Sequence, residues 1–98
     1  MNTDLNSILD SVGDEESFVR FLQALAKDRA DEEEKEKNHP SPPYGPGANG
    51  WENGTIENFL EAAAAWAEDS QGEMPGYQKA TNPWQRCAEI LRAGKFYE

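Results

Sequence analysis

The chain has 98 residues, the size of one ordinary domain, and its three Trp, three Tyr and four Phe supply apolar surface for a core. One cysteine excludes an intrachain disulfide, and no segment approaches the roughly 20 apolar residues of a membrane span. The formal net charge of -10 disfavours nucleic acid and anionic membranes as partners and favours a basic protein surface. We therefore expect a single cytoplasmic domain over residues 1–98, with no signal peptide.

The first part of the chain predicts a short helix and then a long one. Apolar residues recur at helical spacing at Leu5, Ile8, Leu9 and Val12. Gly13 ends this pattern, and Asp14 is suited to be the N-cap of the second helix. The second helix has one apolar face, made by Phe18, Phe21, Leu22, Leu25 and Ala26. It is expected to continue to about Glu36, where no apolar face holds it, so its last turns should project or fray.

Charge is distributed unevenly between two acidic segments. The run 27–37 holds six acids and four bases, with Asp31 and Lys35 at the i,i+4 spacing of a helical ion pair. Residues 51–76 hold six acids and no base. The uncompensated negative field is therefore expected over 51–76, although a charge excess that serves only solubility is the simpler interpretation.

The segment 38–50 holds four of the six prolines and three of the eight glycines. Proline removes backbone donors and glycine raises the entropy cost of ordering, so helix and central strand are both excluded. We expect a flexible Pro/Gly-rich loop within the domain.

A third helix is predicted after this loop, with Thr55 as its N-cap and an end near Gly72. Its predicted core face consists of Ile56, Phe59, Leu60, Ala63, Trp66 and Ala67. Four consecutive alanines, 62–65, combine high helix propensity with small volume and allow a second helix to approach closely.

A fourth helix is predicted from its capping residues, with Asn82 as N-cap, Pro83 at the first position and Gln85 at the third. Its predicted inner face consists of Trp84, Cys87, Ala88 and Leu91. The fold class is therefore all-α, a small bundle of three main helices plus a short N-terminal one.

Three pieces of the sequence resemble the bacterial domain-of-unknown-function family 7660. They are Ser17-Phe18-Val19-Arg20-Phe21-Leu22, the run from Trp51-Glu52-Asn53-Gly54-Thr55-Ile56 to Trp66, and Pro83-Trp84 leading to Ala88-Glu89-Ile90-Leu91 and Tyr97-Glu98. The resemblance covers most of the chain except 37–50. It implies an all-helical fold and a bacterial or phage setting, and it implies no catalytic residues.

The candidate binding residues are Glu57, Glu61 and Glu68, which share one flank of the predicted third helix. Like charges at i,i+4 cost a helix a few tenths of a kcal/mol, so something basic is expected to cover them. That cover is either internal, from Lys79, Arg86, Arg92 or Lys95, or a partner's basic surface, with a metal ion as a third alternative. Tryptophans are more often core than contact surface, but Trp51, just before the helix, is the one expected to be exposed and to anchor a partner.

Catalytic and metal-binding patterns are absent from the sequence. Cys87 lacks a histidine at catalytic spacing and is expected to be a buried, inert thiol between Trp84 and Leu91. His39 is the only histidine, which excludes a multi-histidine metal site, and no cofactor is expected.

The function that these features favour is a non-enzymatic acidic protein-binding domain that takes no metal. An inhibitor of a basic bacterial target, such as an immunity or anti-defence protein, fits the charge and size. Two alternatives stay open: a carboxylate-based metal-dependent hydrolase using Glu57, Glu61 and a neighbouring residue, and an accessory subunit of a larger assembly.

Overall fold

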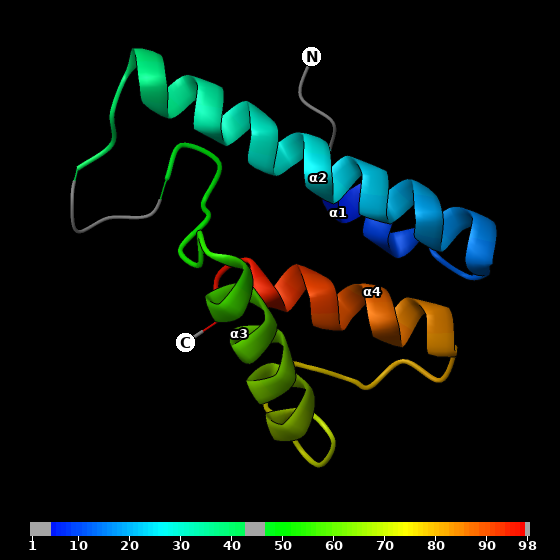
Figure 1. Ribbon diagram of the computed structural model, residues 1–98. Helices are drawn as coiled ribbons and strands as arrows, with labels where there is room; N and C mark the ends of the chain where they lie inside the picture. The colour runs from blue at the N-terminus through cyan, green and yellow to red at the C-terminus, as the bar shows by residue number, and fades with distance from the viewer. Residues whose placement is uncertain (1–4, 43–46, 98) are drawn as a thin grey trace.

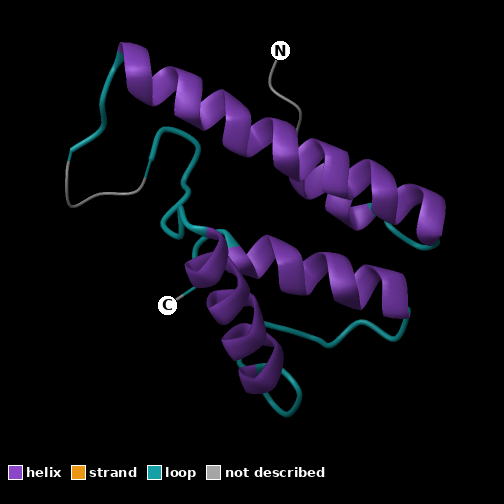
Figure 2. Ribbon diagram, viewed as in Figure 1, coloured by secondary structure: helices purple, strands orange, loops and turns teal. Residues whose placement is uncertain are grey.

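The computed structural model describes residues 5–42 and 47–97, and these fold into four α-helices. The helices are α1 (Leu5–Asp10), α2 (Glu15–Asn38), α3 (Ile56–Asp69) and α4 (Pro83–Gly94). Within the described residues there is no strand, only an isolated bridge between Met74 and Tyr77 (Figure 2). The predicted all-α bundle, with three main helices and a short N-terminal one, is confirmed.

The three longer helices begin at the N-caps that the sequence predicts. The Asp14 side chain accepts from Ser17 N at 2.9 Å, and the Ser17 hydroxyl in turn accepts from Asp14 N at 3.1 Å, which forms a capping box. Thr55 accepts from Asn58 N, and Asn82 accepts from the first backbone amides of α4. Local sequence therefore fixes where these helices start.

The core lies where α1, α2 and α4 meet, and Figure 1 shows α2 and α4 running alongside each other. Phe21 and Ala88 are fully buried at this junction. Phe18 of α2 lies against Trp84 of α4, with ring centroids 5.5 Å apart. The remaining buried apolar residues of this cluster are Leu9, Val12, Leu25 and Trp51.

Helix α3 packs on α4 through small residues. A Cβ placed on Gly94 would lie 2.8 Å from the Phe59 carbonyl oxygen and 3.1 Å from the Ala63 Cβ, so only glycine allows this approach. Ala63 is buried at this contact, as the alanine run predicts, and Ala62 beside it is also buried. By contrast, α3 does not pack on α2 in the described structure, and this leaves a space between the two helices.

Helix α2 ends at Asn38, close to the predicted end at about Glu36. Its last turns are held by polar contacts, which the expectation of a projecting or frayed end did not include: carboxylates of this part of α2 accept hydrogen bonds from the segment that follows. Residues 43–46 of the predicted flexible loop lie outside the described residues. Flexibility over 38–50 therefore stays a prediction.

None of the helices in the described ranges combines the length and the apolar character needed to cross a bilayer.

Candidate functional site

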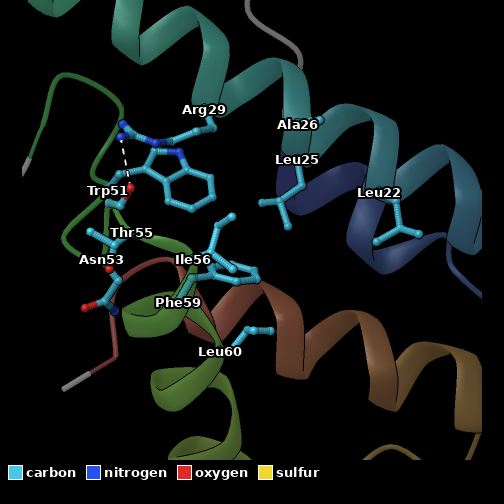
Figure 3. A pocket seen from close by; sticks show the side chains of 11 residues that line it. Leu22, Leu25, Ala26, Arg29, Trp51, Asn53, Thr55, Ile56, Phe59 and Leu60 are labelled. Atoms are coloured by element: carbon cyan, nitrogen blue, oxygen red, sulfur yellow. Dashed lines mark hydrogen bonds between the residues drawn. The ribbon is translucent and has the colours of Figure 1, made fainter.

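An apolar groove of about 390 Å³ lies between α2 and α3. Figure 3 shows its lining side chains, which come down from α2, up from α3 and across from the segment that precedes α3. The lining residues are Leu22, Leu25, Ala26, Arg29, Trp51, Asn53, Gly54, Thr55, Ile56, Phe59 and Leu60. Most of these side chains are apolar, so an occupant of the groove would be held chiefly by apolar burial.

Trp51 forms the floor of the groove with Phe59, their ring centroids 5.8 Å apart. Only 8% of Trp51 is exposed, and its Nε1 donates to Asp28 at 2.8 Å. The cations of Arg29 and Lys95 lie 5.8 and 5.6 Å from the Trp51 ring. The prediction that Trp51 is exposed is wrong: its ring completes the core, and its polar edge is already bonded.

The walls of the groove carry apolar side chains that are open to solvent. Ile56 is 78% exposed and Leu60 is 55% exposed, and Leu22 faces them from α2 with substantial exposure (Figure 3). Placing Ile56 and Leu60 on the core face of α3 is therefore wrong. The periodicity of α3 is correct, but α4 lies against the side of its apolar face that holds Phe59, Ala63 and Trp66 and leaves Ile56 and Leu60 open to solvent.

Beside the groove, α2 is joined to the segment 47–51 by carboxylates, an arrangement we call the polar clasp. Its central member is Glu32, which is 2% exposed and accepts from the backbone amides of Asn49 and Trp51 at 3.0 and 3.1 Å. Arg29 pairs with the same carboxylate at 2.8 Å. A Cβ on Gly47 would overlap this carboxylate, which explains a glycine at that position. The clasp thus fixes the position of Trp51.

Two further carboxylates extend the polar clasp along α2. Hydrogen bonds from the Ser41 side chain and backbone, and from Ala48 N, hold the pKa of Glu36 below its usual range. Hydrogen bonds from Asn49 and Lys35 lower the pKa of Asp31 in the same way. The predicted ion pair between Asp31 and Lys35 is present at 2.9 Å. The clasp was missed because Glu32 looks like one more surface acid in a charged run.

The acidic stripe, defined as Glu57, Glu61 and Glu68, lies on the surface of α3. All three residues are exposed, and in the described residues none takes part in an ion pair. Glu57 and Glu61 each follow an exposed groove residue by one position, so helical geometry places these two acids beside the groove, on the outer side of α3. Glu68 lies about two turns further along the same flank of α3. Whether a partner binds the stripe stays a prediction.

Three of the cations that were candidates for an internal cover have other partners. Arg86 donates to the Ala67 carbonyl at 2.9 Å, and its guanidinium lies 5.0 Å from the Trp66 ring. Arg92 donates to Asn6 at 3.2 Å, and Lys95 pairs with Asp28 at 2.7 Å. The fourth, Lys79, is exposed.

A second polar cluster surrounds Arg86 where α3 meets α4. Arg86 also donates to the Ser70 hydroxyl at 2.9 Å and to the Tyr77 hydroxyl at 3.1 Å, and Tyr77 donates to Glu89. Burial raises the pKa of Tyr77, and the hydrogen bond to the Glu89 carboxylate raises it further. Because these groups satisfy one another, the cluster has a structural role in closing the α3–α4 connection.

The thiol and the histidine do not assemble into a catalytic group. Cys87 is exposed, so the prediction that it is buried between Trp84 and Leu91 is wrong, although both neighbours do pack against the core. His39 is also exposed, at the C-terminus of α2. Across residues 5–42 and 47–97, no three His, Cys, Asp or Glu side chains gather closely enough to hold a metal ion.

Comparison with known proteins agrees with the resemblance seen in the sequence. No curated protein and no solved structure is detectably similar to the chain. The model of the Family of unknown function (DUF7660) matches residues 14–98, which include α2, α3, α4, the groove, the polar clasp and the acidic stripe. The chain therefore belongs to this uncharacterised family, DUF7660.

Proposed function

We propose that the chain is a non-enzymatic binding domain for a basic protein and that the α2–α3 groove, with the acidic stripe at its edge, is the docking surface. One observation carries the proposal: the exposed side chains of Ile56 and Leu60 lie next to carboxylates of the stripe that form no ion pair in the described residues. Apolar side chains at the centre of a patch with charges at its rim form the usual anatomy of a protein interface.

The charge distribution supports a basic partner. Arg29, the one cation in the groove lining, is paired with Glu32 and Glu33 at 2.8 and 3.5 Å, so it contributes little net positive charge. The acids of 51–76, with no base among them, then set the sign of the local field. Such a field raises the association rate of a basic protein.

In its specific form the proposal describes an inhibitor of a basic bacterial target, such as an immunity or anti-defence protein, that acts in the cytoplasm. An inhibitor of this kind needs no catalytic group of its own, because occupying a basic cleft is sufficient to block it. A metal-dependent hydrolase has less support, since Glu57, Glu61 and Glu68 belong to no metal-binding cluster in the described residues.

The test is capture from a lysate of the encoding organism with the immobilised chain and matched variants. Ile56→Gln combined with Leu60→Gln removes the apolar walls, while Val19→Gln changes an exposed apolar residue of α2 that does not line the groove. A true partner is retained by the Val19 variant and lost from the double variant. If that partner is an enzyme, adding the wild-type chain should reduce its activity. Capture that is the same for all variants would contradict the proposed surface.

A further inference from the structure

We infer that the occupant of the α2–α3 groove is an amphipathic α-helix whose apolar face enters the groove and whose basic flank lies against the acidic stripe. This inference rests on the proposed function and specifies the class of partner that the groove accepts.

The walls of the groove offer side chains, and little backbone, to an occupant. The α2 wall lies within the helix, where backbone donors and acceptors are bonded internally. The α3 wall is the first turn of that helix, where the Asn58 and Phe59 amides donate to Thr55 and the amides of Ile56 and Glu57 have no acceptor within the helix. Of the short connecting segment, the Gly54 carbonyl accepts from Arg29 at 3.3 Å (dashed line in Figure 3), and the amide of Asn53 donates to Lys95 O at 3.2 Å. An extended peptide would therefore find few partners for its own backbone, whereas a helix satisfies its backbone internally.

The spacing of the groove residues matches a helix as well. Leu22, Ala26 and Arg29 lie one turn apart along α2, and Ile56 and Leu60 lie one turn apart along α3. Rows at this spacing form the ridges between which the side chains of another helix pack. Two helix pairs of the described bundle are not in contact, α2 with α3 and α1 with α3. Because α2 and α3 each already contact α4, an added helix between them would fill the first of these positions.

Charge selects a basic helix over a second copy of the chain. Two copies would bring together chains of net charge -10 and would place one acidic stripe near another. A helix with Lys or Arg beside its apolar face would instead lie against Glu57 and Glu61 while burying Ile56 and Leu60. This arrangement relieves the i,i+4 repulsion that the stripe otherwise carries.

The probe for this inference is a synthetic peptide of leucine and lysine, about 14 residues long to match α3, with leucines at the helical period. A second peptide of the same composition alternates leucine and lysine, which favours a strand. Binding of each fluorescently labelled peptide is measured by anisotropy for the wild type, for Ile56→Gln with Leu60→Gln, and for Val19→Gln.

The helical-period peptide should bind the wild type and the Val19 variant equally, and the double variant about tenfold or more weakly. If the alternating peptide binds as tightly as the helical-period peptide and the double variant weakens both, the occupant need not be a helix. That result would overturn the inference and leave the proposed binding surface intact. Binding of either peptide that the double variant does not weaken, or no binding at all, would overturn the inference. Sedimentation completes the test, because a dimer that the double variant abolishes would assign the groove to a second copy.

Discussion

Two acidic helices of this protein use their carboxylates in opposite ways. On α2, Glu32 is buried and accepts two backbone hydrogen bonds, and Glu36 accepts bonds from Ser41 and Ala48. On α3, Glu57 and Glu61 are exposed and form no ion pair in the described structure. The denser acidic run is therefore structural, and the sparser one is available to a partner.

The difference shows that charge density in a sequence does not indicate which carboxylates are exposed and without an ion pair. The acids of α2 lie near Arg29, Lys35 and the amides of 48–51, which neutralise or satisfy them. The acids of α3 lie beside a groove whose lining holds Arg29, a cation that is already paired with Glu32 and Glu33.

Trp51→Ala should destabilise the fold by about 3–5 kcal/mol, because it removes a buried ring from the core and leaves Asp28 with only Lys95. Urea unfolding followed by circular dichroism measures the loss. Val19→Ala is the matched control, since Val19 is 42% exposed, and it should cost well under about 1 kcal/mol. A partner-anchoring Trp51 would instead leave the stability of the free protein unchanged.

Glu32→Ala should lower the free energy of unfolding by about 2–3 kcal/mol. The substitution leaves the buried amide of Trp51, the Asn49 amide and the Arg29 guanidinium without their acceptor. Glu33→Ala, an exposed acid one position away, should change the free energy of unfolding by less than about 0.5 kcal/mol. Equal urea midpoints for the two variants would show that the polar clasp does not stabilise the fold.

Acid should loosen the polar clasp at its outer end. The pKa of Glu36 is lowered in the folded state, so its stabilisation is present above the unfolded value of 4.5 and is lost as pH falls through the folded value. The pKa of Asp31 is also lowered from its ordinary value of 3.8, so its stabilisation is lost in the same direction as pH falls. Hydrogen-exchange protection of the Ser41 and Ala48 amides, corrected for intrinsic rates, should fall between about pH 5 and pH 2. In Glu36→Gln this protection should be lower at neutral pH and nearly independent of pH.

The smallest effect is expected for the acidic stripe itself. Glu61→Gln should leave the free energy of unfolding within about 0.5 kcal/mol of the wild type, or raise it slightly, since it relieves repulsion from Glu57. The urea midpoint of this variant, compared with that of Glu32→Gln, separates a surface charge from a structural one. A clear loss of stability in Glu61→Gln would indicate an internal partner for the stripe.

Much of the fold could be predicted because it is encoded locally. The caps at Asp14, Thr55 and Asn82 and the alanine run of α3 each act over a few residues, and all appear where expected. The errors at Ile56, Leu60 and Cys87 have one physical cause: periodicity identifies an apolar face but not which part of it a neighbouring helix covers.

The candidate site was predictable only in part for the same reason. Charge counting identified the stripe of Glu57, Glu61 and Glu68, but the groove depends on how α2 and α3 diverge around α4. Trp51 was wrongly predicted to be exposed, because its partners are distant in the sequence. Asp28 and Glu32 are about 20 residues away and are brought to Trp51 only by the polar clasp.

The central claim, that the acids of α3 rather than the total charge attract a partner, is tested most directly by two triple variants of equal charge. One neutralises Glu57, Glu61 and Glu68, and the other changes Asp10→Asn, Glu16→Gln and Glu34→Gln, exposed positions that do not line the groove. The association rate of the helical-period peptide is measured for both by stopped flow over a range of salt. We predict that only the first variant slows association and flattens its salt dependence. Equal rates for the two variants would contradict the claim and leave net charge as the sole source of attraction.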